Sequence, residues 1–170
     1  MSENKTENKN MPFLSIKDLK VEYMSDGQAV HAVNGVSLTL ERGKTLGLVG
    51  ETGAGKTTIA KSILRILPDI GCHIRQGEIC LDGDNVLTLP EHDMRKIRGN
   101  KVSMIFQDPM TALNPVQRVG EQIAEVVQLH SDGKTDSEAR AKEMLEIVGI
   151  PAERYYEYPH QFSGGMKQRV

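Results

Sequence analysis

The chain has 170 residues, of which 38% are hydrophobic and 26% are charged, a composition typical of one globular domain with a hydrophobic core. Its formal net charge of -2 provides no broad basic field, so we expect no nucleic acid among its main partners. The two cysteines, Cys72 and Cys80, lack the spacing of a disulfide framework or a zinc site. No apolar run approaches the roughly 20 residues needed to cross a bilayer, so any membrane role requires a partner protein.

The first part of the sequence predicts a β-rich opening. Residues 1–13 are polar for most of their length and are expected to form a disordered tail. Apolar side chains alternate with polar ones at 19–23 and again at 36–40, which is the period of half-buried strands. Residues 46–49, Leu-Gly-Leu-Val, are instead continuously apolar, as is typical of a strand buried on both faces of a parallel sheet.

A glycine-rich loop follows this run and carries the strongest signal in the sequence. It matches the pattern G-x-x-x-x-G-K-[ST], whose glycines let successive backbone N–H groups face phosphate oxygens. We expect Lys56 to reach the β- and γ-phosphates and the Thr57 hydroxyl to ligate Mg²⁺, while the N-terminus of the following helix adds partial positive charge. The residues predicted to bind the nucleotide in this segment are Gly50, Glu51, Thr52, Gly53, Ala54, Gly55, Lys56, Thr57 and Thr58.

Further elements follow in the order that such a loop requires. Apolar residues at helical spacing predict a helix over 59–67, which Pro68 ends. Residues 69–88 are expected to hold a connection and one short strand. A short helix over 90–98, begun by proline and capped by glycine, precedes a second buried strand over 102–106.

The last third of the chain is predicted to be helical. Apolar residues share one helical face at 119–126, and the sequence Thr-Asp-Ser-Glu at 135–138 predicts a capping box ahead of a second helix. Gly149 ends that helix. A further helix begins near Ser163 and meets no stop signal before Val170.

Residues 162–169, Phe-Ser-Gly-Gly-Met-Lys-Gln-Arg, resemble the signature motif of ATP-binding-cassette (ABC) proteins, which reads LSGGQ followed by a basic residue and QR. Leu is replaced by Phe162 and Gln by Met166, while the serine and both glycines are retained. In that family these groups meet the γ-phosphate of a nucleotide held by a second subunit, which implies catalytic roles for Ser163 and Gly165. In isolation, a Ser-Gly-Gly sequence also suits a flexible turn.

The same resemblance implies roles for two residues upstream. Gln107 stands where the family places a glutamine that contacts Mg²⁺ or the attacking water, so it is expected to act beside Lys56 in catalysis and beside Thr57 in metal binding. Tyr23 stands where the family has an aromatic ring that stacks on adenine. The alternatives are a polar residue that merely ends a strand for Gln107, and a core-facing strand residue for Tyr23.

The resemblance implies an α/β P-loop NTPase fold of the ABC type, with an N-terminal antiparallel β-subdomain and a helical signature subdomain. We assign residues 14–106 to the nucleotide-binding core, and residues 107–170 to the glutamine loop, the helical subdomain and the signature motif. In this family, three further functional residues follow the signature motif in the sequence: an acidic residue at the end of a strand, the catalytic glutamate and the switch histidine. We therefore expect these three residues beyond Val170, and expect the chain to be an N-terminal fragment that is inactive alone.

The sequences of residues 31–37, 104–110, 113–115 and 158–166 are most similar to those of the ATPase subunits of bacterial dipeptide and oligopeptide importers. This implies ATP and Mg²⁺ as cofactors, and a peripheral position on the cytoplasmic face of the cell membrane. The implied partners are permease subunits, a second homologous ATPase as heterodimer partner, and indirectly an extracytoplasmic solute-binding protein. The ATPase subunits of nickel importers share much of this sequence. The alternatives are a soluble cassette ATPase acting on macromolecular complexes and a nucleotide-binding module without turnover.

Overall fold

The computed structural model describes residues 11–25, 27–107, 112–131, 133 and 135–170. The described residues up to Ser103 form one compact unit (unit 1) and those from Met104 to Val170 form another (unit 2), each with a hydrophobic core of its own. Asp108, which follows the predicted site residue Gln107 directly in the sequence, lies outside the described residues. None of the described helices is long and apolar enough to cross a membrane.

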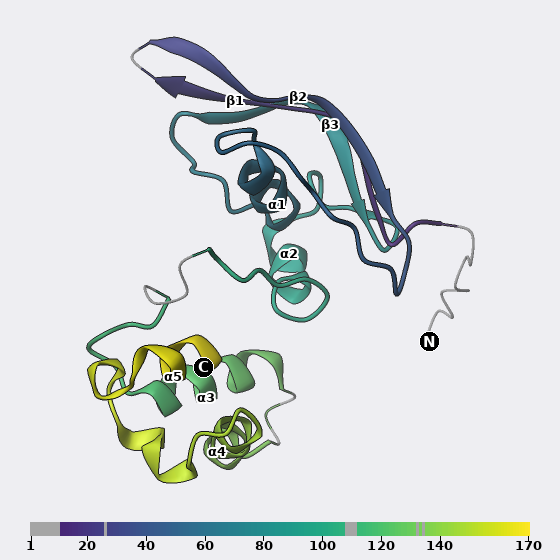
Figure 1. Ribbon diagram of the computed structural model, residues 1–170. Coiled ribbons are helices and arrows are strands. Elements are labelled where there is room, and N and C mark those ends of the chain that lie inside the picture. The colour runs from purple at the N-terminus through teal and green to yellow at the C-terminus, as the bar shows by residue number, and fades with distance from the viewer. Residues whose placement is uncertain (1–10, 26, 108–111, 132, 134) are drawn as a thin grey trace, which may run out of the picture. The chain divides into compact units, whose positions relative to one another are not determined.

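Unit 1 is built on a four-stranded antiparallel sheet with the strand order β2-β1-β3-β4 (Figure 1). Its strands are β1 (Leu14–Ser25), β2 (Gln28–Leu40), β3 (Cys72–Leu81) and β4 (Asp84–Asn85). The alternation at 19–23 and 36–40 predicted two of these strands correctly, because both runs lie within the β1–β2 pair. The short strand expected within 69–88 is a ten-residue strand that pairs with β1 along most of its length.

Helices α1 (Lys56–Leu64) and α2 (Glu91–Ile97) lie on the same side of this sheet (Figure 1). They belong to one core with the sheet, because Ile59 of α1 and Met94 of α2 join the buried residues of the strands. Each large apolar side chain buried in this way stabilises the fold by about 1.5–3 kcal/mol. The sheet contributes Leu14, Ile16, Leu19, Val21, Val33, Cys72, Ile79 and Leu81 to the core.

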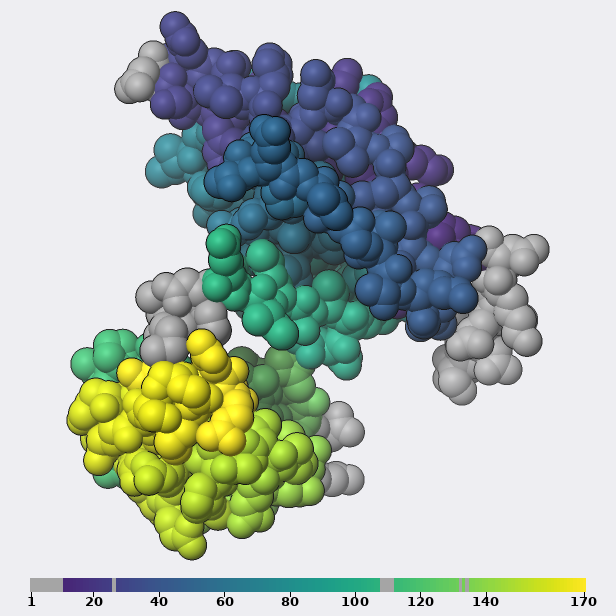
Figure 2. Space-filling model, viewed as in Figure 1, coloured from purple at the N-terminus to yellow at the C-terminus, as the bar shows by residue number. Residues whose placement is uncertain are grey.

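The prediction of buried strands at 46–49 and 102–106 is wrong, because neither segment forms a strand. Residues 41–54 are all exposed and form no strand, and the mid-blue segment of Figure 2 shows this stretch open on the visible surface of unit 1. Val49 is 94% exposed and Ile105 is 91% exposed. A strand requires a neighbour for its backbone N–H and C=O groups. The described residues provide only an isolated bridge between Arg98 and Val102 and no strand beside either run.

Two other boundaries differ from the sequence predictions. Helix α1 ends at Leu64 and not at Pro68, because Arg65 adopts left-handed backbone angles (φ 52°, ψ 46°) that stop the helix. Phe13, which we placed in a disordered tail, packs partly buried against the core of unit 1, and its carbonyl oxygen accepts a hydrogen bond from Asp82 N–H at 2.8 Å. Residues 1–10 of that tail lie outside the described part of the chain.

Unit 2 is helical, with α3 (Val119–His130), α4 (Ser137–Ile147), the 3-10 turns η2 (Ala152–Tyr156) and η3 (Pro159–Gln161), and α5 (Gly164–Arg169). The helices predicted at 119–126, after 135–138 and from Ser163 are therefore present. Asp136 caps α4, accepting hydrogen bonds from the N–H groups of Glu138 and Ala139, so the capping box that begins at Thr135 is not formed. The core of this unit consists of Val119, Ala124, Ala141, Leu145, Ile150, Tyr155 and Phe162.

Candidate functional site

The glycine-rich loop leads directly into the N-terminus of α1, which begins at Lys56. Gly55, the residue before the helix, has a φ of 83°, in the left-handed region that favours glycine. A Cβ atom at this position would lie 2.2 Å from the carbonyl oxygen of Ala32 in β2. The Ile59 N–H group donates to the Gly55 carbonyl at 2.9 Å and closes the first helical turn. Both the backbone conformation and the contact with β2 therefore require glycine at residue 55.

The side chain of Lys56 turns back across the loop. Its Nζ donates to the carbonyl oxygens of Gly50 and Glu51, each at 2.6 Å. These two contacts hold a full positive charge between the first residues of the loop and the N-terminus of α1, where the helix dipole adds partial positive charge. A cation fixed at a helix N-terminus is the arrangement that binds phosphate.

The backbone of the glycine-rich loop forms a hydrogen bond within the loop. The Ala54 N–H group donates to the Glu51 carbonyl at 3.1 Å, so that donor is used within the loop. Gly53 has a φ of 86°, and no atom would lie within 4 Å of a Cβ atom added there. The open side of the loop at Gly53 therefore has room for an approaching phosphate group.

Tyr23 and Thr58 meet beside the first turn of α1. The Tyr23 hydroxyl and Thr58 Oγ1 lie 3.5 Å apart, and either atom could donate. Tyr23 is partly buried and packs against the core of unit 1, while Thr58 is buried. The structure thus brings Tyr23 to the helix that follows the loop, a place compatible with both adenine stacking and a core role. Thr58 faces inward, whereas its neighbour Thr57 is exposed.

The signature residues occupy the N-terminus of α5 in unit 2. Ser163 caps this helix, its Oγ accepting from the Met166 N–H group at 3.3 Å. Ser163 and Gly165 are exposed, whereas Phe162 is only 4% exposed and anchors the motif in the core. An apolar side chain is what this buried position requires, which explains how phenylalanine can replace the usual leucine.

Sequence reasoning missed Arg169 as a residue that supports the signature helix. Its Nη1 donates to the Val148 carbonyl at 3.1 Å, and its Nε donates to the Gly165 carbonyl at 3.3 Å. Arg169 therefore ties α5 to the chain just after α4. The signal that could have revealed it is the basic residue at the end of the motif, one turn after the glycine pair.

Thr57 and Gln107 are the two residues that the sequence predicts as Mg²⁺ ligands. Both are exposed, and a hydroxyl and an amide oxygen are suitable hard ligands. In the part of the chain that the structure describes, no three His, Cys, Asp or Glu side chains gather into a metal site. Mg²⁺ usually keeps several waters and binds substrate phosphates with few protein ligands, so the oxygen of either side chain is a suitable ligand for it. Gln107 belongs to unit 2 and Thr57 to unit 1.

A glycine-rich loop that enters a helix packed on a sheet, together with a serine-capped signature helix in a second unit, defines a P-loop nucleotide-binding cassette. The family model described as ABC transporter matches residues 33–170. The chain belongs to this family.

Two curated relatives indicate the kinds of protein in which similar sequences occur. The chain is 43% identical over 160 residues to the oligopeptide transport ATP-binding protein OppD of Bacillus subtilis (strain 168), covering 92% of the chain and 45% of that protein. It is 45% identical over 162 residues to the dipeptide transport ATP-binding protein DppD of the same organism, covering 92% of the chain and 48% of that protein. The chain thus spans about half the length of the curated relatives it matches.

Solved structures confirm the cassette fold. A dimeric post-hydrolysis state of the ATP-binding cassette MJ0796, bound to ADP and Pi, matches with a TM-score of 0.76 and 24% sequence identity. The match covers 92% of this chain and 66% of that one. At this level of identity the comparison establishes the fold, which is the ABC-type α/β fold expected from the sequence.

Proposed function

We propose that this chain is the ATP-binding part of an importer ATPase, which couples ATP binding and hydrolysis to the uptake of dipeptides or oligopeptides. The observation that carries the proposal is the position of Lys56, held by two loop carbonyls at the N-terminus of α1. Phosphoryl transfer depends mainly on positioning and on neutralising charge, and a fixed cation at this place supplies both. The names of the two peptide-transport relatives support a peptide as the solute.

The predicted catalytic, adenine-stacking and metal-binding residues each have a role in this scheme. Lys56 binds the β- and γ-phosphates against the backbone of the glycine-rich loop, and Tyr23 stacks on the adenine. Thr57 and Gln107 would each offer an oxygen ligand to Mg²⁺, which would neutralise charge at the phosphates when bound. Ser163 and Gly165 serve the nucleotide of a second ATPase subunit, because an exposed helix N-terminus favours an anion from outside the chain.

The proposed partners follow from this division of labour. A second, homologous ATPase subunit would receive the signature helix, permease subunits would carry the solute, and an extracytoplasmic binding protein would deliver it. The chain would then act as a peripheral protein on the cytoplasmic face of the cell membrane.

Replacing Lys56→Ala in the full-length gene product should weaken ATP binding by at least tenfold, because it removes a charge-assisted contact to phosphate worth about 1.5–3 kcal/mol. Titration with a fluorescent ATP analogue measures this change. Lys61→Ala is the matched control, because Lys61 lies in the last turn of the same helix. Equal affinities for the Lys56→Ala variant and the wild type would contradict the loop assignment.

The solute is tested separately in cells that lack the chromosomal gene. The wild-type gene should restore uptake of a labelled dipeptide or tetrapeptide, and the Lys56→Ala gene should not. Restored uptake of nickel without peptide uptake would replace the peptide assignment and leave the ATPase assignment intact.

A further inference from the structure

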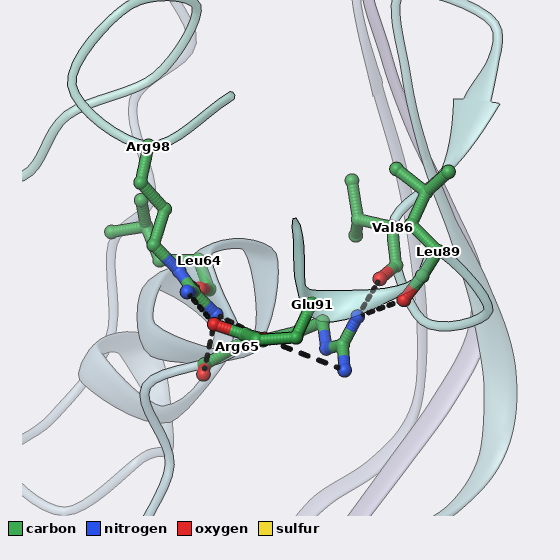
Figure 3. Close-up of polar contacts among 6 residues, drawn as sticks. All are labelled: Leu64, Arg65, Val86, Leu89, Glu91 and Arg98. Carbon is green, nitrogen blue, oxygen red and sulfur yellow. Dashed lines mark hydrogen bonds and ion pairs between the residues drawn. The ribbon is translucent and has the colours of Figure 1, made fainter. Parts of the chain in front are cut away.

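Two arginines and one glutamate form a cluster at the C-terminal end of α1, the end of the helix opposite the phosphate loop (Figure 3). Arg65 follows the last residue of α1, Glu91 is the first residue of α2, and Arg98 follows the last residue of α2. All three side chains belong to unit 1. None of the roles proposed above uses them.

Arg98 connects the end of α2 to the end of α1. Its Nε donates to the Leu64 carbonyl at 2.7 Å and its Nη2 donates to the Arg65 carbonyl at 3.3 Å. The last carbonyls of a helix have no partners within the helix, and a cation is favoured beside them. The same guanidinium donates to Glu91, from Nη1 to Oε1 at 2.5 Å and from Nη2 to Oε2 at 3.5 Å. Only a planar, multidentate cation can make these contacts together.

Arg65 fastens the same helix end to the segment before α2. Its Nη1 donates to the carbonyl oxygens of Val86 at 3.2 Å and Leu89 at 2.5 Å, and its Nη2 lies 3.9 Å from Glu91 Oε2. The side chains of Arg65 and Arg98 are 28% and 25% exposed, respectively. The hydrogen bond from Arg98 also lowers the pKa of the Glu91 carboxyl, which favours its ionised form. Helix α1 is thus held at its C-terminal end by two cations that share one carboxylate.

The chain beyond Arg98 leads toward Gln107. The Gly99 N–H group donates to the Val102 carbonyl at 2.8 Å, and the Lys101 N–H group donates to the Ile97 carbonyl at 2.8 Å. These bonds form a tight turn directly after Arg98, and the chain then continues through 103–106. The contacts that hold Arg98 in place therefore also hold the start of the segment that ends at Gln107, the proposed Mg²⁺ ligand.

We propose that Arg98 is a positioning residue that joins the phosphate-loop helix to the segment leading to Gln107, so that nucleotide binding at one end of α1 orders the segment 98–107, which begins at the other end. This inference rests on the proposed function, because it requires ATP at the loop. Helix α1 has nine residues and packs in the core of unit 1, and Arg98 contacts the carbonyl oxygens of its last residue and its C-cap directly. A packed helix and a hydrogen-bonded network form the kind of contiguous path that can carry coupling between two places.

The test is hydrogen exchange on the full-length protein, measured by mass spectrometry with and without a non-hydrolysable ATP analogue and Mg²⁺. In the wild type the analogue should slow exchange both in the loop with α1 and in residues 98–107. In Arg98→Met the first response should remain and the second should be lost. The ATPase kcat should fall about tenfold while KM for ATP changes less than twofold, because coupling and not binding is removed.

Two further variants test whether the specific contacts of Arg98, and not merely a positive charge near this end of α2, are required. Arg95→Met removes a cation from the exposed side of the same helix, and it should behave as the wild type. Arg98→Lys keeps the charge and the aliphatic stem, and it should show the same selective loss as Arg98→Met, because an ammonium cannot reach both helix ends in this geometry.

The outcomes distinguish this inference from the proposed function. An unchanged response of residues 98–107 in Arg98→Met, with the loop still protected, would overturn the inference alone. A wild-type response restored in Arg98→Lys, or an equal loss in Arg95→Met, would also overturn it, because charge would then suffice. A wild-type protein whose loop gains no protection from the nucleotide would overturn the proposed function and this inference with it.

Discussion

Two glycines of the phosphate loop share one backbone conformation but differ in what surrounds them. Gly53 and Gly55 both have left-handed angles, with φ of 86° and 83°. A Cβ atom at Gly53 would meet nothing within 4 Å, whereas one at Gly55 would lie 2.2 Å from the Ala32 carbonyl oxygen. The pair therefore separates the cost of the backbone conformation from the cost of a clash with β2.

We predict that Gly53→Ala lowers the free energy of unfolding by about 1–2 kcal/mol, the cost of a left-handed alanine. Gly55→Ala should cost clearly more, because either the loop or the β2 backbone must move to admit the methyl group. Urea unfolding without nucleotide, followed by circular dichroism, measures both changes. Equal losses in the two variants would show that the loop can leave β2 freely, and would contradict the packing described here.

The roles of single side chains were less accessible to sequence reasoning than the loop itself. The pattern identified Lys56, but not that two loop carbonyls hold its ammonium group. Tyr23 was assigned by resemblance, and the structure adds a contact with Thr58 that no local pattern reveals, because the two residues are distant in sequence. The nucleotide roles of these residues stay predictions.

At the scale of elements, α4 and η2 are joined by one polar cluster. Lys142 Nζ donates to Glu138 Oε1 at 2.6 Å and contacts the Tyr156 hydroxyl at 3.1 Å, while that hydroxyl donates to Glu138 Oε1 at 2.6 Å. The hydrogen bonds from Lys142 and then from Tyr156 lower the pKa of the Glu138 carboxyl. The hydrogen bond to Glu138 in turn raises the pKa of Lys142.

The signs of these shifts predict a pH dependence. A carboxyl with a lowered folded-state pKa stabilises the fold fully above its ordinary value of about 4.3, and this contribution disappears as the pH falls through the lowered value. The contribution of Lys142 is present below its ordinary value of about 10.4 and disappears only as the pH rises through the raised value. Glu138→Gln should therefore be less stable than the wild type at pH 7, and the difference should shrink below about pH 4.

Urea midpoints measured at intervals from pH 3 to pH 8 test this prediction. Glu143→Gln is the control, because Glu143 is an exposed residue of the same helix that pairs with Arg140, and an exposed pair contributes little. A Glu138→Gln variant whose deficit is the same at pH 3 and pH 7 would show that the carboxylate charge has no part in joining α4 to η2.

Sequence periodicity predicted the elements whose neighbours are near in the chain. Strands β1 and β2 form a hairpin, so alternation at 19–23 and 36–40 was enough to identify them. The extent of β3 was missed because it is set by pairing with β1, far earlier in the sequence. The end of α1 was missed for a related reason. The carbonyl groups of residues 86 and 89 hold Arg65, and the sequence around Pro68 gives no sign of these distant contacts.

At the scale of the whole molecule, the failure at 46–49 and 102–106 follows from the same rule. Continuous apolar runs show that a segment is suited to burial between other elements, but not that those elements are present beside it. In this structure the run at 46–49 lies on the surface. In the run at 102–106, Val102 packs partly buried against the core of unit 1, while Ile105 is 91% and Phe106 is 46% exposed. Extended apolar segments with free backbone groups are templates for association with another chain.

We therefore predict that the 170-residue polypeptide self-associates as its concentration rises, and that Ile105→Lys reduces this association several-fold by placing a charge within one of the runs. Ile70→Lys is a closely matched control, because Ile70 is 93% exposed and Ile105 is 91% exposed, yet Ile70 lies in a bend outside both runs. Sedimentation velocity at several protein concentrations measures the effect. A chain that stays monomeric throughout, or an equal response to the two substitutions, would show that exposure of single apolar residues and not the extended runs governs the behaviour of the molecule.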